Sequence, residues 1–183
     1  MKLVAALSLI IVLAQTVMAE ADCSSQAIAP GTYVIVSAIG DGRCIDKKSQ
    51  DAESVQFIPC NGSRNQQFKF GEKDANGCYR INSVSSSDRY LVKTGVLGGV
   101  PEVLAEPSVA KANYDRWLVR ATGDGNFNLL LATDGTECMD RRDPDDQGRA
   151  QVITCTGVIQ QKFSLQVAQA NKAAKSKNAK SKE

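Results

Sequence analysis

The sequence predicts an all-β fold, and three features of the chain support this prediction. Short segments in which apolar and polar residues alternate recur from about residue 31 to residue 167, as expected for half-buried strands. Clusters of Gly, Asp, Ser and Asn separate these segments and are typical of turns. No stretch of this body shows the sustained 3.6-residue period of an amphipathic helix.

The first strand pattern occurs three times. It reads glycine, any residue, an aromatic residue, any residue and an aliphatic residue, and its copies are GTYVIVS from Gly31, GCYRINS from Gly77 and GNFNLLL from Gly125. The copies start 46 and 48 residues apart. Self-similarity at such a period indicates a repeat architecture, in which a single copy cannot bury its own apolar face.

Three further elements follow the first one in every copy. The second element ends thirteen residues after the aromatic residue, at Asp46, Val92 and Asp140. The third begins at Val55, Glu102 and Ala150, and the fourth begins at Asn65, Tyr114 and Gln160. Four short strands in each of three copies predict a β-trefoil with pseudo-threefold symmetry, whose repeats cover about residues 31–76, 77–124 and 125–167.

The alternation also predicts which side chains fill the centre of the fold. Burying an aliphatic or aromatic side chain of this kind stabilises a fold by roughly 1.5–3 kcal/mol. The predicted core residues are Tyr33, Ile35, Ile45, Val55, Phe57, Phe68, Tyr79, Ile81, Leu91, Leu104, Trp117, Phe127, Leu129, Met139, Val152 and Phe163.

The two ends of the chain differ from the body in composition. Residues 1–19 have a lysine, an apolar run and small residues at the end, as in a secretory signal peptide that is cleaved after Ala19. An N-terminal segment, residues 20–30, would then precede the trefoil. Residues 168–183 form a lysine-rich tail without aromatic residues, for which we expect disorder. The chain is therefore expected to be secreted and not transmembrane.

Secretion makes a disulfide framework plausible for the six cysteines. Cys44 and Cys60 lie within repeat one, and Cys138 and Cys155 occupy the same places in repeat three, so we expect each to form a pair. Each bridge would close a loop whose constraint contributes roughly 3 kcal/mol in the chain-entropy model. Cys23 and Cys78 remain, and we pair them by elimination.

Composition excludes several classes of function. The chain has a net charge of +2, but its tail is basic and its body slightly acidic, so the body is not a nucleic-acid platform. It contains no histidine, which excludes Ser-His and Cys-His nucleophiles and His-ligated metals. We therefore expect neither an enzyme nor a metal or other cofactor. The tail lysines could bind an anionic surface; they are Lys172, Lys175, Lys177, Lys180 and Lys182.

The polar residues of repeats one and three resemble a known family. Repeat one reads C-x-D at Cys44, Q-x-x-x-C at Gln56, and N-Q-x-aromatic at Asn65; repeat three follows the same pattern from Cys138, Gln151 and, with Gln for Asn, from Gln160. This combination resembles the ricin B-type lectin domain, the R-type or QxW β-trefoil, over nearly the whole body.

The resemblance implies carbohydrate binding in two repeats. In that family the aspartate accepts hydrogen bonds from sugar hydroxyls, and a carboxylate beside an amide suits adjacent hydroxyls because charge-assisted hydrogen bonds are strong. The implied carbohydrate-binding residues are Asp46, Gln56, Asn65, Gln66, Asp140, Gln151, Gln160 and Gln161. Galactose or N-acetylgalactosamine is the family's commonest target.

The chain departs from the family pattern at three places. Ile58 and Ile153 stand where an aromatic residue would stack on the sugar, which predicts weak binding at each site. Val92 replaces the aspartate in repeat two, which predicts no sugar there. The alternative is a structural role for these polar residues of repeats one and three. The glutamines could bond the hairpin backbone, and the aspartates could stabilise turns.

These features predict a secreted, non-catalytic, lectin-like protein with weak, multivalent binding to glycans or glycoproteins. The alternative is a β-trefoil that acts through protein contact, as a protease inhibitor or receptor ligand, with degenerate sugar sites. Asn61 begins an Asn-Gly-Ser sequon, and a glycan there would lie beside the repeat-one site.

Overall fold

The fold is described from a computed structural model of residues 1–183. It describes residues 27–48, 54–94, 103–106, 114–141 and 148–169. The predicted signal peptide (residues 1–19), Cys23 and residues 170–183 of the lysine-rich tail lie outside these ranges and stay predictions.

The described chain consists of short strands joined by turns and two 3-10 turns. Residues of the first strand alternate between partly and fully buried positions, as the sequence pattern predicts. The strands are β1 (Gly31–Ser37), β2 (Arg43–Lys47), β3 (Val55–Pro59), β4 (Gln67–Phe70), β5 (Ile81–Ser83), β6 (Tyr90–Lys93), β7 (Val103–Glu106), β8 (Trp117–Ala121), β9 (Phe127–Leu131), β10 (Glu137–Arg141), β11 (Ala150–Thr154) and β12 (Phe163–Val167), and the 3-10 turns are η1 (Arg64–Gln66) and η3 (Ile159–Gln161).

The first and fourth strands of the repeats form a closed barrel. Antiparallel pairing runs from β8 to β9, β12, β1, β4 and β5. An antiparallel bridge between Tyr79 and Trp117 joins the β5 side back to β8 and completes the ring. Closure leaves no unpaired barrel edge, which protects a chain of short strands from pairing with other chains.

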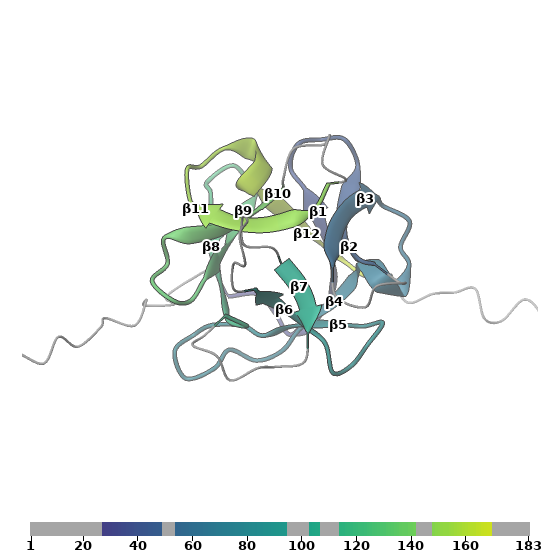
Figure 1. The fold of residues 1–183 in the computed structure, drawn as a ribbon, viewed down its shortest axis with the longest axis horizontal. Coiled ribbons are helices and arrows are strands. Elements are labelled where there is room, and N and C mark those ends of the chain that lie inside the picture. The colour runs from purple at the N-terminus through teal and green to yellow at the C-terminus, as the bar shows by residue number, and fades with distance from the viewer. Residues whose placement is uncertain (1–26, 49–53, 95–102, 107–113, 142–147, 170–183) are drawn as a thin grey trace, which may run out of the picture.

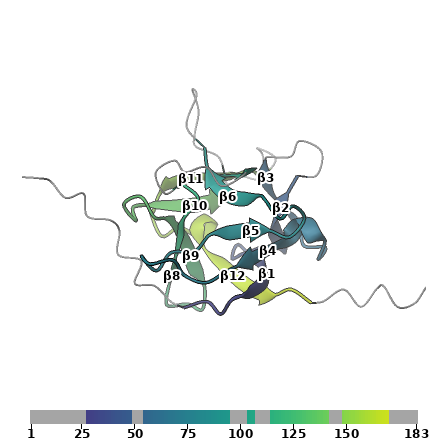
Figure 2. The same cartoon turned by 90° about the horizontal axis from the view of Figure 1, so that it is seen from below.

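The second and third strands of each repeat form a hairpin outside the barrel. The hairpins are β2–β3, β6–β7 and β10–β11. Viewed in Figure 1, the three repeats surround a common centre, and Figure 2 shows the labelled hairpin strands gathered at one end of the barrel. This arrangement is the β-trefoil with pseudo-threefold symmetry, and the fold prediction is confirmed.

Two hairpins meet at Gly148. The backbone N–H of Phe57 in β3 donates to the Gly148 carbonyl at 2.6 Å. Gly148 has φ of +63°, and a Cβ atom at this position would lie 2.8 Å from the Phe57 carbonyl oxygen. Only glycine suits both the backbone angle and the close approach, so this residue sets how repeats one and three pack.

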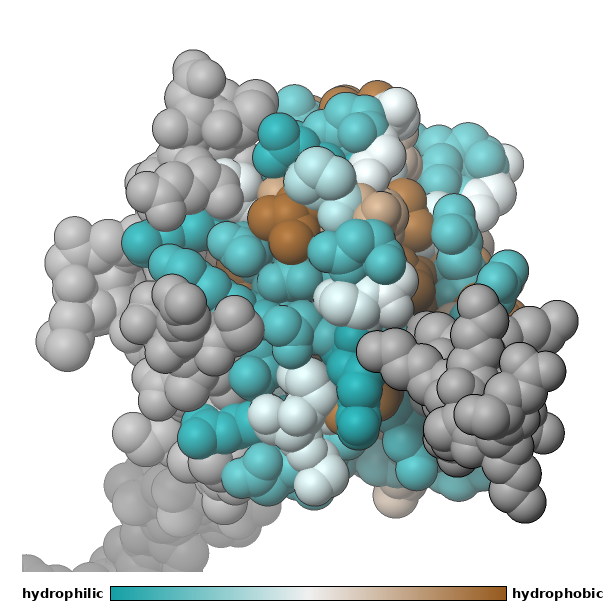
Figure 3. All heavy atoms as spheres, turned by 90° about the vertical axis from the view of Figure 1, so that its right-hand side faces the viewer, coloured by the Kyte–Doolittle hydropathy of each residue, from teal (hydrophilic) through white to brown (hydrophobic). Residues whose placement is uncertain are grey.

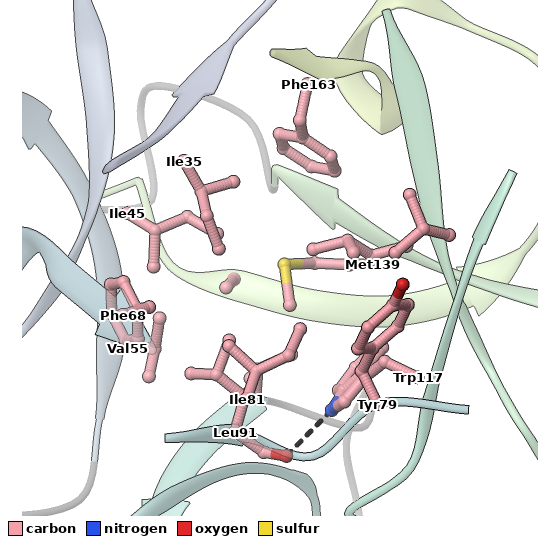
Figure 4. Packing of buried hydrophobic residues seen from close by; sticks show 14 of the residues in the cluster. Ile35, Ile45, Val55, Phe68, Tyr79, Ile81, Leu91, Trp117, Met139 and Phe163 are labelled. Atoms are coloured by element: carbon pink, nitrogen blue, oxygen red, sulfur yellow. Dashed lines mark hydrogen bonds between the residues drawn. The ribbon is translucent and has the colours of Figure 1, made fainter. Parts of the chain in front are cut away.

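The core lies along the barrel axis. Figure 4 shows Met139 among aliphatic and aromatic side chains from all three repeats, with the Trp117 indole N–H donating to the Leu91 carbonyl at 2.8 Å. Trp117 is therefore buried without an unpaired donor. Fourteen predicted core residues belong to this cluster, as predicted: Ile35, Ile45, Val55, Phe57, Phe68, Tyr79, Ile81, Leu91, Trp117, Phe127, Leu129, Met139, Val152 and Phe163.

Two core predictions need correction or stay open. Tyr33 is only partly buried and packs against the edge of the cluster, because its hydroxyl donates to the Ala29 carbonyl near the surface. In repeat two, Val103 of the third strand pairs with Lys93 and is fully buried; Glu102, where we expected this strand to begin, lies outside the described residues. Leu104 lies opposite Val92, at the register of Gln56 and Gln151, but its side chain lies outside the described ones, so its place in the core stays a prediction.

The two equivalent disulfides are present. Cys44 is bonded to Cys60, and Cys138 to Cys155, each linking the second strand of its repeat to the loop after the third. Cys78 is also disulfide-bonded. Its expected partner, Cys23, lies outside the described residues. The part of the chain that the structure describes contains no helix with the length and apolar character needed to cross a membrane.

Candidate functional site

Two aspartates occupy equivalent places on the hairpins. Asp46 in β2 lies opposite Gln56 in β3, and Asp140 in β10 lies opposite Gln151 in β11. The Gln56 amide donates to Asp46 Oδ1 at 3.4 Å, and the Gln151 amide donates to Asp140 Oδ1 at 2.9 Å. The sequence prediction that these residues come together is therefore met in both repeats, with the tighter pair in repeat three.

Both carboxyl groups are held in unfavourable surroundings for a charge. Each aspartate is only 4% exposed. Burial raises the pKa of Asp46 and of Asp140, although hydrogen bonds from neighbouring glutamines act in the opposite direction. A carboxylate with this environment still has hydrogen-bond acceptor capacity that the protein does not fill.

Turn aspartates elsewhere in the chain behave differently. Asp134 accepts the backbone N–H of Thr136 at 2.9 Å, and this bond is the main reason why its pKa is lowered. Asp74 accepts backbone N–H groups in the same way, which lowers its pKa against the effect of burial. Asp46 and Asp140 lie within strands and have raised pKa values, so the turn-stabilising alternative does not describe them.

Gln66 and Gln161 bond the backbone, as the structural alternative proposed. Gln161 Oε1 accepts the N–H groups of Thr156 and Gly157, and its amide donates to the Thr154 carbonyl at 2.9 Å. Gln66 makes the equivalent bonds in repeat one. Both glutamines are fully buried. The amides of Gln66 and Gln161 also act to lower the pKa of Asp46 and of Asp140, against the larger effect of burial.

Asn65 and Gln160 precede these glutamines in η1 and η3, which pack against β2 and β10. Asn65 is half-buried and Gln160 is exposed. Among the described residues, neither side-chain amide forms a hydrogen bond with the protein. Each therefore offers both a donor and an acceptor, and Gln160 lines the same cleft as the buried Asp140.

Ile58 and Ile153 lie two residues after Gln56 and Gln151 on the same strand faces. Both are half-buried. They offer an aliphatic surface beside each aspartate where the family pattern has a ring.

Figure 3 shows one side of the molecule as mostly hydrophilic, with hydrophobic residues in small separate patches.

The repeat-three site opens into a cleft that the sequence did not predict. Its volume is about 540 Å³, within the range of about 300–1,000 Å³ for ligand pockets. The cleft lies between β10, η3 and the turn that follows β1, and its lining residues are Ile39, Asp41, Arg43, Asp140, Arg141, Val158 and Gln160. Three of these come from repeat one. Sequence reasoning missed them because it treated each repeat separately.

A partly buried ion pair crosses this cleft. Arg141 Nη1 donates to Asp41 Oδ2 at 2.6 Å, and Arg43 Nε lies 3.4 Å from the same oxygen. Burial raises the pKa of Asp41, but the hydrogen bond and charge of Arg141, together with Arg43, outweigh it and hold the pKa below its usual value. Arg141 is 3% exposed, and its guanidinium lies 5.8 Å from the centre of the Phe57 ring.

Repeat two has a different set of residues at the corresponding place. Val92 stands in the aspartate position and pairs with Leu104, so the carboxylate and its glutamine partner are both replaced. Asp115 stands where the other repeats have a buried glutamine, and it forms an ion pair with Arg80 at 3.0 Å. Lys93 Nζ lies 5.6 Å from the centre of the Tyr114 ring.

Comparison with known families supports the fold and the repeat pattern. The chain matches the family described as "Ricin-type beta-trefoil lectin domain-like" over residues 23–96 and 64–155, together more than half of its length. No curated protein matches the sequence.

Solved structures share this fold at low sequence identity. A mosquitocidal holotoxin aligns with a TM-score of 0.72 and 14% identity over 78% of this chain, which spans only 18% of the toxin. A designed threefold-symmetric protein, ThreeFoil, aligns at 0.63 and 19% over 74% of this chain and 97% of its own. A ricin B-like lectin of Macrolepiota procera, solved with lactose, aligns at 0.62 and 17% over 78% and 99%.

Proposed function

Because the chain belongs to the ricin-type β-trefoil lectin domain-like family, we propose that it is a secreted, non-catalytic lectin for galactose-type sugars. Repeats one and three would each bind one sugar residue. The observation that carries the proposal is the pair of buried aspartates, each beside an amide with free hydrogen-bonding capacity.

The chemistry of each site suits a pair of sugar hydroxyls. The free oxygen edge of Asp140 would accept from two adjacent hydroxyls, and the Gln160 amide would donate to one of them and accept from another. Gln151 and Gln161 would keep the carboxylate in place. Asp46, Asn65, Gln56 and Gln66 would act in the same way in repeat one.

Neither site offers the machinery of hydrolysis. A glycoside hydrolase needs two carboxyl groups on opposite sides of the scissile bond, one as acid and one as base or nucleophile. The repeat-one site has a single aspartate, and in the repeat-three cleft the second carboxylate, Asp41, is already paired with Arg141 and Arg43. This supports a binding role rather than a catalytic one.

Binding at one site would be weak. Without an aromatic ring beside Asp46 or Asp140, we expect a dissociation constant in the millimolar range, or about −4 kcal/mol. Two sites on one rigid body would raise the apparent affinity for surfaces that present many copies of the sugar. The Macrolepiota procera lectin, which has the same fold, was solved with lactose, which supports a galactose-type sugar.

Secretion is supported by the disulfides at Cys44–Cys60 and Cys138–Cys155, because such bonds persist in oxidising compartments. The leader pattern of residues 1–19 and the sequon at Asn61 agree with export. Asn61 is exposed, and its Oδ1 accepts the Ser63 backbone N–H at 2.8 Å. A glycan on Asn61 and contact of the lysine-rich tail with an anionic surface remain parts of the proposal.

A glycan array tests the proposal. The labelled protein, clustered for multivalent display, should bind galactose-terminated glycans. The double variant Asp46→Asn plus Asp140→Asn should lose at least about tenfold of this binding, since it removes both charged acceptors while keeping their shape. Asp134→Asn is the matched control, because it makes the same change at a surface turn.

Two outcomes would overturn the proposal. One is an array on which the wild-type protein binds no glycan. The other is binding that the double variant retains in full. Either would favour the alternative function, a trefoil that acts on a protease or receptor through its loops.

A further inference from the structure

The cleft beside Asp140 belongs to two repeats. Asp140 and Gln160 come from repeat three, whereas Ile39, Asp41 and Arg43 come from the turn after β1 in repeat one. The backbone holds these parts together, since the Ala38 N–H donates to the Lys162 carbonyl at 2.9 Å. The turn of repeat one is thus a fixed wall of the repeat-three site.

This wall and the opposite loop both present aliphatic side chains to solvent. Ile39 is 37% exposed and Val158 is 44% exposed. Exposed aliphatic groups that line a concave cleft beside polar groups are typical of ligand pockets. Sugars have hydroxyl edges and apolar C–H faces, so the polar floor at Asp140 suits the hydroxyls of one sugar unit and the aliphatic walls at Ile39 and Val158 suit the C–H face of the next unit.

The charges of the cleft favour an uncharged ligand. Asp41 is shared by Arg141 and Arg43, so both bases already face a carboxylate. An anionic ligand would have to compete with Asp41 and would also approach Asp140. A neutral glycan avoids both penalties, because its hydroxyls can bond to the exposed atoms of Asp41 and Arg43 without adding charge.

The corresponding boundary between repeats one and two lacks these features. Ser63 and Ser85 stand at the positions of Val158 and Ile39 when the repeats are aligned on their aromatic residues. Arg64 donates to the Val84 carbonyl at 2.9 Å across that boundary. The aliphatic walls are therefore particular to the cleft of repeat three.

We propose that the repeat-three site extends across the repeat boundary and selects a neutral glycan of at least two sugar units. The first unit binds Asp140 and Gln160. The second lies between Ile39 and Val158. This inference rests on the proposed function. It means that the two sites bind ligands of different length, one sugar unit in repeat one and two units in repeat three.

The test compares methyl β-galactoside with lactose by titration calorimetry. Asp46→Asn serves as the background, so that repeat three alone is measured. We expect lactose to bind about five- to tenfold more tightly than methyl β-galactoside, since a second buried sugar face adds contact area. Adding Ile39→Ser and Val158→Ser should remove this preference and leave the methyl β-galactoside affinity unchanged.

Ile159→Ser is the matched control. Ile159 neighbours Val158 and is 42% exposed, but it is not among the residues that line the cleft. It should keep the preference for lactose. Thermal unfolding of each variant checks that the fold is intact.

The outcomes separate the two proposals. Equal affinities for both sugars, or a lactose preference that survives the double serine change, would overturn the two-unit site while leaving the lectin proposal in place. Absence of binding by both sugars, together with an empty glycan array, would overturn both.

Discussion

Repeats one and three place the same polar residues at the same register but differ at their outer boundaries. In both, an aspartate faces a glutamine across a hairpin, and a buried glutamine bonds the loop backbone behind it. The boundary between repeats one and two has serines and an arginine, Arg64, which donates to the Val84 carbonyl. The boundary between repeats three and one has aliphatic side chains and a partly buried ion pair.

The difference shows which features the scaffold determines. The hairpins pair in the same register to fill one core, so the positions of the aspartate and its glutamine recur in every repeat, although repeat two has Val92 and Leu104 there. The turns that face a neighbouring repeat do not contribute to that core, so their residues can differ from one boundary to the next. Ligand length and affinity are therefore expected to depend on the boundary turns, whereas the basic contact with hydroxyls depends on the hairpins.

The largest expected effect is on stability at the boundary of repeats three and one. Asp41→Ala should lower the free energy of unfolding by about 2 kcal/mol, because it removes a carboxylate partner of the buried Arg141 guanidinium. Arg64→Ala, at the other boundary, should change it by less than about 1 kcal/mol, since the lost bond is exposed. Urea denaturation measures both. Equal losses would mean that the two boundaries are energetically alike.

The next effect concerns sugar affinity. Asp140→Asn should weaken the tighter of the two lactose-binding steps by about tenfold, because a charge-assisted acceptor becomes a neutral one. Asp46→Asn should leave this step unchanged and remove only the weaker one. Calorimetric titration of both variants decides between them. If Asp46→Asn removed the tighter step, the prediction that repeat three binds lactose more tightly than repeat one would be wrong.

Acid should weaken binding at both sites. Burial raises the pKa of Asp46 and Asp140 above the ordinary value of 3.8, so both lose their charge at a higher pH than a surface aspartate does. Lactose affinity should therefore fall as the pH is lowered through these raised pKa values, at a higher pH than the one at which surface aspartates titrate. Affinity measured over this range, with circular dichroism to confirm folding, checks the direction. A constant affinity throughout would contradict it.

The smallest effect is a gain in stability. A raised pKa means that the stability contributed by the protonated carboxyl is present below pH 3.8 and lost as the pH rises through the raised value. Asp140→Asn should therefore raise the free energy of unfolding slightly at neutral pH. Asp134→Ala, which removes a turn acceptor with a lowered pKa, should lower it. Thermal unfolding compares the two, and a loss of stability in Asp140→Asn would indicate a structural role for this aspartate.

The sequence predicted the elements that repeat. The spacing of Tyr33, Tyr79 and Phe127 indicated three copies, because the same positions recur at one period. Asp46 with Gln56 and Asp140 with Gln151 were found in the same way. The core place of Val103 was missed, since repeat two lacks the cysteines that align the other hairpins.

The cleft could not be predicted from the repeats alone. Asp41 and Arg141 are 100 residues apart and meet only because the barrel closes β12 against β1. A signal was nevertheless present in the sequence. Ile39 and Val158 are aliphatic where the neighbouring boundary has Ser85 and Ser63, and such a departure within a repeat alignment marks a residue with a local role.

The most direct test follows the side-chain amides of Gln56 and Gln151 by two-dimensional nuclear magnetic resonance during a lactose titration. Each amide donates to the aspartate of its own site, so each reports binding in one repeat. Both signals should shift, with Gln151 saturating at the lower lactose concentration. If neither signal moves while lactose is raised well above millimolar concentration, the buried aspartates are not sugar acceptors.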